Sequence, residues 1–216
     1  MIKAIIFDMD GLLFDTESAY SVVQSAMSKK RGKEFTSEIK KPMMGQKAHE
    51  VMRLLSDFFG KGEKVEDLLA EQDGQLVEVY DGSVRKTEGV DDIISFINKH
   101  GIRKCIGTSS RRFLVDILLN KFHLEKEFEF IISGDMAKNG KPDPEIYNLC
   151  VAGLELLPEE CLVLEDSLNG VKAAISAECK VCAIPSEYTK SEDFSKADLI
   201  CSSLVDNRLK EFILNR

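Results

Sequence analysis

The chain of 216 residues is long enough for one large domain, or for one domain that carries a smaller inserted one. Its 44% hydrophobic residues exclude a mostly disordered chain, and none of its apolar runs approaches the roughly 20 residues that a membrane span needs. The formal net charge of −8 argues against a nucleic-acid partner or a membrane partner, because both reward clustered lysine and arginine.

The N-terminus has the pattern of a short strand. Its apolar stretch, Ala4 to Phe7, is too short for a signal peptide and meets Asp8 at once, so we expect a cytoplasmic protein. Reduced cysteines are expected as well, because most of the six fall within apolar runs, where a thiol behaves as a small hydrophobe. Cys179 and Cys182 fit the C-x-x-C pattern, but Cys182 lies within such a run, which argues against a redox pair.

A helical insertion follows the first strand. Almost a hundred residues separate that strand from the next apolar run, at 102–106, which is too many for one crossover. The stretch from about 18 to 84 contains only helix-like patterns. We therefore predict a helical cap domain, residues 16–84, inserted into a core domain formed by residues 1–15 and 85–216. Two short linkers would let such a cap rock against the core.

The core segment alternates short apolar runs with helix-like segments. Runs of strand length lie at 102–106, 130–132, 162–164, 181–184 and, more weakly, 199–201, and helical patterns lie near 91–97, 111–121, 144–154 and 167–177. Strands that alternate with helices predict an α/β fold with a doubly wound parallel sheet, a Rossmann-like core with helices on both faces.

Two acids directly follow the first predicted strand. Asp8 and Asp10 stand at its carboxyl end, where open α/β sheets place their ligands. Side chains two residues apart on a strand point the same way, so both can address one locus, and Gly11 lets the chain turn sharply. A solvated acidic loop explains a lone D-x-D pattern equally well.

The next three strand ends also carry polar groups. The second strand ends in the hydroxyl-bearing run 107–110, although one of its serines could simply cap the following helix. Lys141 follows the third strand, and Glu165 and Asp166 follow the fourth. Parallel topology brings these ends to one edge, and clustered carboxylates without histidine suit Mg²⁺. A carboxylate near a phosphoryl dianion faces a repulsion of about 8 kcal/mol, which Mg²⁺ and Lys141 can offset.

In this order, the D-x-D-G run, the Thr/Ser run, the Lys-Pro pair and the Glu-Asp pair resemble the four motifs of the haloacid dehalogenase-like hydrolases. The segments 7–17, 140–147 and 164–174 resemble the subgroup that has a helical cap inserted after the first motif. That subgroup includes β-phosphoglucomutase-like proteins and small-metabolite phosphatases. Among the latter is pseudouridine 5′-phosphatase, which segment 44–48 also resembles.

The resemblance implies a role for each motif residue. Asp8 would take the phosphoryl group, and Asp10 would protonate the leaving oxygen and then act as a base for water. The phosphoryl oxygens would be held by Thr108, Ser109 and Lys141. The Mg²⁺ ligands would be Asp8, Asp10 through its carbonyl, Asp166 and, in or just outside that shell, Glu165. The dehalogenases of the superfamily lack an acid at the position of Asp10, so dehalogenation is disfavoured.

At several positions this sequence departs from the family's patterns, and these departures bear on the choice between a phosphatase and its relatives. The mutase pattern implies a cap His near position 20 and cap cations for a second phosphate, but Tyr20, Ala48 and Glu78 stand there. A phosphonate-cleaving relative would need a cap lysine, and Lys47 lies one residue off that spacing. Glu178 stands where the family has a helix-ending glycine. This difference affects the stability of the fold rather than the chemistry.

We therefore expect a Mg²⁺-dependent phosphatase, monomeric, that hydrolyses small phosphorylated metabolites such as sugar phosphates or nucleotide-like monophosphates. A β-phosphoglucomutase-type mutase is the alternative, and a non-catalytic metabolite-binding relative is disfavoured because every chemical position is filled. Substrate recognition falls to the cap, where the candidates are Glu17, Tyr20, Gln46 and Lys47, followed by Met44 and His49.

Overall fold

The structure is a computed structural model that describes residues 1–44, 46–60 and 62–214. Within these residues, a six-stranded sheet follows the order β3-β2-β1-β4-β5-β6, and every neighbouring pair is parallel. The strands are β1 (Ala4–Phe7), β2 (Arg103–Gly107), β3 (Ile131–Ile132), β4 (Cys161–Glu165), β5 (Lys180–Ala183) and β6 (Leu199–Ile200). The strand order reverses between β1 and β4, and this switch point is where such sheets bind ligands.

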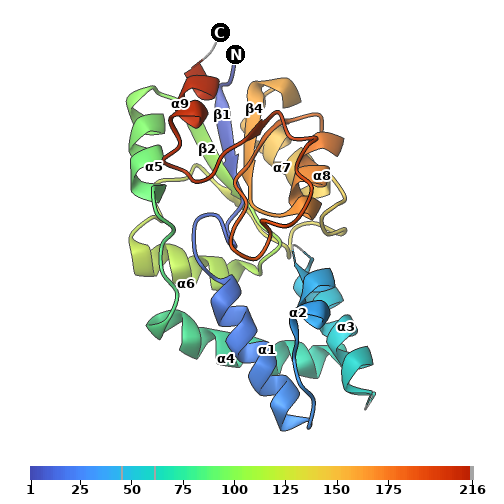
Figure 1. Ribbon diagram of the computed structural model, residues 1–216. Helices are drawn as coiled ribbons and strands as arrows, with labels where there is room; N and C mark the ends of the chain where they lie inside the picture. Colours follow the sequence, from blue (N-terminus) through green and yellow to red (C-terminus); the bar gives the residue numbers. More distant parts are fainter. Residues whose placement is uncertain (45, 61, 215–216) are drawn as a thin grey trace.

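Helices cover both faces of the sheet, as the sequence predicts (Figure 1). The side chains of β1 alternate, so that Ile5 and Phe7 join one core cluster while Ala4 and Ile6 join another. The first cluster packs against α5 (Val90–Lys99), α6 (Arg112–Phe122) and α9 (Asn207–Leu214). The second packs against α7 (Glu145–Leu154) and α8 (Leu168–Ser176), and a short turn, η2 (Pro158–Glu160), precedes β4. The prediction of a doubly wound α/β core is confirmed.

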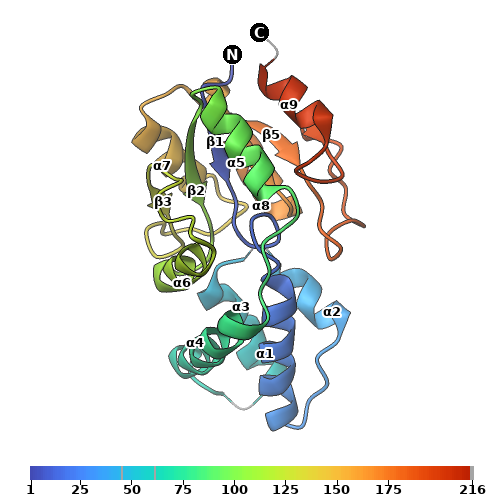
Figure 2. The same cartoon turned by 90° about the vertical axis from the view of Figure 1, so that its left-hand side faces the viewer.

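The helical segment lies between β1 and β2 in sequence and forms a separate layer beside the carboxyl edge of the sheet (Figures 1 and 2). It comprises α1 (Glu17–Lys30), α2 (Ser37–Lys40), η1 (Lys41–Met43), α3 (Ala48–Phe59) and α4 (Val65–Gly82). Apolar residues at helical spacing on α3, among them Val51, Leu55 and Phe59, are buried in the cap. The inserted helical cap is therefore present, and its boundaries at residues 15/16 and 84/85 stay a prediction.

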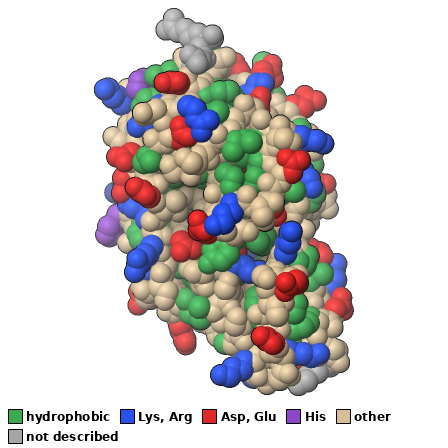
Figure 3. Space-filling view, viewed as in Figure 1, with side chains coloured by type: hydrophobic (Ala, Val, Ile, Leu, Met, Phe, Trp, Pro, Cys, Tyr) green, Lys and Arg blue, Asp and Glu red, His purple; other side chains and the backbone are tan. Residues whose placement is uncertain are grey.

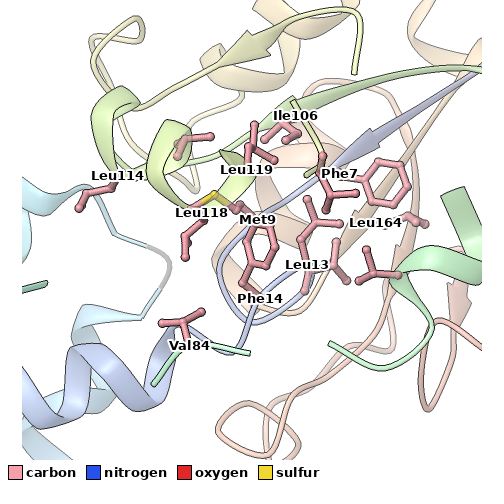
Figure 4. Packing of buried hydrophobic residues seen from close by; sticks show 14 of the residues in the cluster. Phe7, Met9, Leu13, Phe14, Val84, Ile106, Leu114, Leu118, Leu119 and Leu164 are labelled. Atoms are coloured by element: carbon pink, nitrogen blue, oxygen red, sulfur yellow. The ribbon is translucent and has the colours of Figure 1, made fainter. Parts of the chain in front are cut away.

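Two short segments of chain connect the cap to the core, and they lie side by side. The N–H of Asp15 donates to the carbonyl of Arg85 at 2.9 Å, and the N–H of Thr87 donates to the carbonyl of Leu13 at 3.0 Å. Beside them, the ring of Phe14 stacks on Phe122 with centroids 5.0 Å apart. Figure 4 shows Phe14 between Met9, Leu118 and Val84, so apolar packing continues from the sheet to the foot of the cap.

The apolar length of the helices and the distribution of charged side chains agree with the composition. No helix among residues 1–44, 46–60 and 62–214 is long and apolar enough to cross a membrane. Acidic and basic side chains are interspersed over the face shown in Figure 3. On that face the negative formal charge is spread rather than gathered in one field.

Candidate active site at the carboxyl edge of the sheet

The first strand fixes Asp8 at the switch point. The backbone N–H of Asp8 donates to the carbonyl of Leu164 at 3.0 Å, which anchors the chain between β1 and β4. The turn that follows needs a glycine, because Gly11 adopts φ of 81° and an added Cβ would overlap the carboxylate of Asp166. The side chains of Asp8 and Asp166 are both buried there.

Lys141 reaches this carboxylate from the loop that precedes α7. It is only 2% exposed, and its ammonium donates to Asp8 Oδ1 at 2.5 Å and to Glu165 Oε1 at 2.5 Å. Burial alone would lower the pKa of Lys141, but the two carboxylates raise it above its ordinary value. Lys141 is therefore a fixed positive charge beside the proposed nucleophile.

Glu165, at the end of β4, is fully buried and makes four hydrogen bonds. Oε1 accepts from the Tyr147 hydroxyl at 2.7 Å as well as from Lys141, and Oε2 accepts from the Ser167 N–H at 2.9 Å and hydroxyl at 3.0 Å. An added Cβ at Gly170 would overlap Glu165, so the first turn of α8 can approach only because it carries glycine. These contacts make Glu165 the orienting partner of Lys141.

Hydroxyl groups surround the second acid, Asp10. Thr16 donates to Oδ1 at 2.7 Å, while Thr108 at 3.1 Å and Ser110 at 2.7 Å donate to Oδ2. The Tyr20 hydroxyl lies 3.2 Å from Ser110 Oγ. Three hydroxyl donors therefore fix the orientation of this carboxyl group, and the network connects the cap to the end of β2.

A carboxylate cluster is suited to a divalent cation. Asp8, Glu165 and Asp166 each offer an oxygen, and these atoms lie within 4.8 Å of one another. Burial, and then mutual repulsion, raises the pKa of Asp8 and of Asp166. Buried oxygens with this unbalanced charge fit Mg²⁺. The carboxyl of Asp10 points to its hydroxyl donors instead, and the metal-ligand assignment of all four acids stays a prediction.

A cavity of about 730 Å³, counted with its open mouth, lies between this cluster and the cap. The predicted residues Ser109, Glu17, Tyr20, Gln46 and Met44 line it together with Asp8, Asp10, Lys141 and Asp166. Gly45, part of the segment 44–48, lies outside the described residues.

Three predicted residues are placed differently. Thr108 is fully buried and bonds Asp10. The ammonium of Lys47 donates to the core carbonyls of Ala137 at 2.6 Å and Lys138 at 3.3 Å, so it joins the cap to the core. His49 lies 3.9 Å from Glu66, and its side chain is about half exposed. The substrate roles of these residues are not tested by their positions.

Sequence reasoning missed several residues at this site. Ser110, one of the two serines for which the sequence left a capping role open, donates its hydroxyl to Asp10, and Arg111 takes the cap position of α6. Tyr147 stands within the segment 140–147 without a role of its own. The cavity is also lined by Gln24, Lys40 and Gln72. The sequence did carry a signal for the two glutamines, because each is a polar side chain at a position where the apolar spacing of its helix predicts a buried apolar one.

Comparisons with known proteins agree with this geometry. A family model described as haloacid dehalogenase-like hydrolase matches residues 5–184. A "Phosphorylated carbohydrates phosphatase" of Thermotoga maritima is 33% identical over 175 residues, covering 81% of each chain. A "Probable pseudouridine-5'-phosphatase" of Drosophila melanogaster is 30% identical over 213 residues, covering 96% of this chain and 92% of the relative.

Among solved structures, CbbY from Rhodobacter sphaeroides in complex with phosphate superimposes with a TM-score of 0.84 at 28% identity. The match covers 95% of this chain and 96% of that one. The family model covers most of the chain, and a helical cap follows the first motif, as the sequence resemblance implies. The chain is therefore an enzyme of the haloacid dehalogenase-like hydrolase family, in the subgroup that carries a helical cap.

Proposed function

We propose that this enzyme is a Mg²⁺-dependent phosphatase that hydrolyses small phosphate monoesters, sugar phosphates or nucleotide-like monophosphates, through an aspartyl-phosphate on Asp8. The observation that carries the proposal is the buried carboxylate of Asp8, held by Lys141 at 2.5 Å on the floor of a cavity that the cap covers. The printed names of two relatives, a phosphorylated-carbohydrate phosphatase and a pseudouridine-5'-phosphatase, support this substrate class.

In the first step, a carboxylate oxygen of Asp8 attacks phosphorus and the bond between phosphorus and the ester oxygen breaks. The leaving oxygen takes a proton from Asp10, which lines the same cavity. Lys141 keeps its charge beside the phosphoryl group throughout, because the carboxylate of Glu165 holds its ammonium in place.

In the second step, Asp10 accepts a proton from water, whose oxygen attacks phosphorus, and the bond to Asp8 breaks to release inorganic phosphate. Thr16, Thr108 and Ser110 hold the carboxyl group of Asp10 in place for this role, because each hydroxyl donates a hydrogen bond to it. The buried oxygens of Asp8 and Asp166, with the Asp10 carbonyl, would hold Mg²⁺, with Glu165 in or beside that shell. When bound, the ion neutralises the charge that develops on the phosphoryl oxygens.

The cavity favours a phosphatase over the mutase alternative. A mutase must hold a bisphosphate, and a second phosphate needs cationic partners of its own. Among the described residues that line the cavity, the cations are Lys141 and Lys40. Lys40 lies 2.8 Å from the carboxylate of Glu17, so its charge is already balanced. The cavity thus has one phosphate-binding end.

Phosphate release from a panel of sugar phosphates and nucleoside monophosphates, measured with Mg²⁺, tests the proposal. We expect steady release without a bisphosphate primer, loss of turnover on chelation, and its return when Mg²⁺ is added back. Asp8→Asn is a second test. It should lower kcat at least about 10³-fold, since it removes the proposed nucleophile, and circular dichroism should show that the variant is still folded. Substantial turnover by Asp8→Asn, or isomerisation that needs a bisphosphate, would overturn the proposal.

A further inference from the structure

Two buried glutamines form part of the cavity wall on the cap side. Gln24 of α1 is 4% exposed and Gln72 of α4 is 1% exposed, and Gln24 Nε2 donates to Gln72 Oε1 at 3.0 Å. A buried carboxamide costs stability unless its polar atoms are hydrogen-bonded. Two apolar side chains would join α1 to α4 at no such cost, so packing between the helices does not explain the pair.

The hydrogen bond between the two glutamines leaves most of their hydrogen-bond donors and acceptors without a partner on the other glutamine. Each carboxamide has one carbonyl and two N–H donors, and this bond occupies one carbonyl and one N–H. One carbonyl, that of Gln24, and three N–H groups therefore remain. Both side chains line the same cavity as Asp8 and Asp10, so a ligand in that cavity can use these groups.

Gln24 and Gln72 lie where the part of a substrate farthest from its phosphate would extend. Tyr20, one helical turn before Gln24 on α1, touches Ser110, and Ser110 touches Asp10. Four residues of α-helix rise about 6 Å, which places Gln24 one turn further along the cap than Tyr20, the cap residue that reaches Asp10 through Ser110. The phosphoryl group belongs at Asp8, so the amides lie where the remainder of a bound ester would extend.

The charges at this end agree with a neutral ligand. Lys40, the lining cation on the cap side among the described residues, is paired with Glu17 at 2.8 Å and also donates to Ser21 Oγ at 2.6 Å. What the cap offers beyond this balanced pair is uncharged hydrogen-bonding capacity.

We propose that Gln24 and Gln72 form a specificity subsite for the part of the substrate that carries no phosphate, and that this part is a neutral polyhydroxy chain or ring. Adjacent hydroxyls fit because each can both donate and accept, which matches a free carbonyl beside free N–H groups. The inference rests on the proposed phosphatase function and narrows it to phosphate monoesters of sugars or polyols that extend past Tyr20.

Gln24→Leu and Gln72→Leu test the subsite, because leucine keeps an apolar side chain of similar reach and removes the amide. The steady-state kinetics are compared for the best sugar phosphate of the panel and for p-nitrophenyl phosphate, which has no hydroxyls. We expect kcat/KM for the sugar phosphate to fall at least 10-fold, mainly through KM, and kcat/KM for p-nitrophenyl phosphate to stay within about 2-fold. Gln75→Leu, on the same helix and outside the cavity lining, is the matched control and should change neither.

A second measurement uses the unaltered enzyme, so it does not depend on the folding of a variant. Deoxy analogues of the same sugar phosphate should lose at least 10-fold in kcat/KM when the missing hydroxyl is one that the amides bind. Equal losses for both substrates in the leucine variants, or unchanged kinetics with every deoxy analogue, would overturn the subsite and leave the phosphatase assignment standing. Absence of phosphate release from any monoester would instead overturn the proposed function.

Discussion

At the scale of single residues, Lys141 is a buried cation on which both the stability of the fold and the proposed chemistry depend. It lies between Asp8 and Glu165, which are themselves almost fully buried. Burial raises the pKa of Asp8 above its usual range, and Lys141 is the largest influence that lowers it. Removal of the ammonium would leave two buried carboxylates without a cationic partner, and such a loss costs about 3–5 kcal/mol.

Lys141→Met should therefore lower the free energy of unfolding by about that amount near neutral pH, raise KM and lower kcat. This loss of unfolding free energy should be smaller at acidic pH. Without Lys141 the folded-state pKa of Asp8 rises further, so the folded variant binds protons more readily than the unfolded chain and loses stability as pH rises through that value. Urea unfolding at pH 5 and pH 8 measures this. Lys104→Met, a buried lysine paired with Glu127 far from the cavity, should cost stability but leave KM unchanged.

Glu178 is a residue whose backbone is strained for a purely structural reason. It follows the end of α8 with φ of 60°, the left-handed region that glycine adopts freely. Glu178→Gly should raise the free energy of unfolding by about 1 kcal/mol, because a side chain in this region is disfavoured by roughly that amount. Glu211→Gly, inside α9, should lower it by a similar amount. An unchanged urea midpoint in Glu178→Gly would show that the strain is relieved elsewhere.

At the scale of elements, the contact between α8 and β4 determines how the site is held. The first turn of α8 presses against Glu165 because Gly170 has no side chain, and Ser167 caps the helix by accepting from the Gly170 N–H at 3.1 Å. Glu165 in turn holds Lys141. We therefore expect a shift of α8 by a fraction of an ångström to displace the Lys141 ammonium that contacts Asp8.

Gly170→Ala should consequently destabilise the fold by about 1–3 kcal/mol, the usual cost of overpacking, and lower kcat by displacing Glu165 and Lys141. Gly74→Ala is the matched control, since an added Cβ there meets nothing within 4 Å. It lies inside α4, where alanine should stabilise by about 0.5–1 kcal/mol without altering kinetics. Thermal unfolding and kcat of both variants are compared. A Gly170→Ala enzyme with normal kcat would contradict the coupling between α8 and Lys141.

The elements were largely predictable because their signals are local. Strands such as Ala4–Phe7 are short apolar runs, and α5 repeats Ile93, Ile94 and Ile97 at helical spacing before a glycine. Parallel topology then brings the strand ends to one edge without further information. The partners across that edge were less predictable: for Ser110 the sequence left a capping role open, whereas its hydroxyl bonds Asp10, 100 positions away in sequence.

At the scale of the whole molecule, the position of the cap over the core depends on contacts that leave no periodic signal. Asp73 of the cap pairs with Arg111 of the core, and Asn169 Nδ2 donates to the carbonyl of Met44 at 3.1 Å. Lys121 of α6 donates to the carbonyls of Tyr80 and Asp81 at the end of α4. Each contact joins residues from distant segments whose proximity follows only from the packed fold, so the sequence predicts that a cap exists but not how it is placed on the core.

Lys47 is the member of this group that the sequence assigned to substrate binding. Its ammonium bonds two carbonyls of the core, at Ala137 and Lys138, and its methylene groups lie where a Cβ of Gly140 would stand. Substrate binding and cap attachment make different kinetic predictions. A residue that binds the substrate tail affects only substrates that have that tail, whereas a residue that holds the cap shut affects every substrate, because closure excludes water and completes the site.

We expect Lys47→Met to lower kcat/KM by a similar factor, about 5-fold, for a sugar phosphate and for p-nitrophenyl phosphate, as loss of about 1 kcal/mol of closed-state stabilisation would. The melting temperature should change little, because the contact joins two preformed parts. Lys41→Met, an exposed lysine in the same cap segment, should leave both substrates unaffected. A loss confined to the sugar phosphate would instead assign Lys47 to the substrate, since the free energy of cap closure is the same whichever ester is bound beneath it.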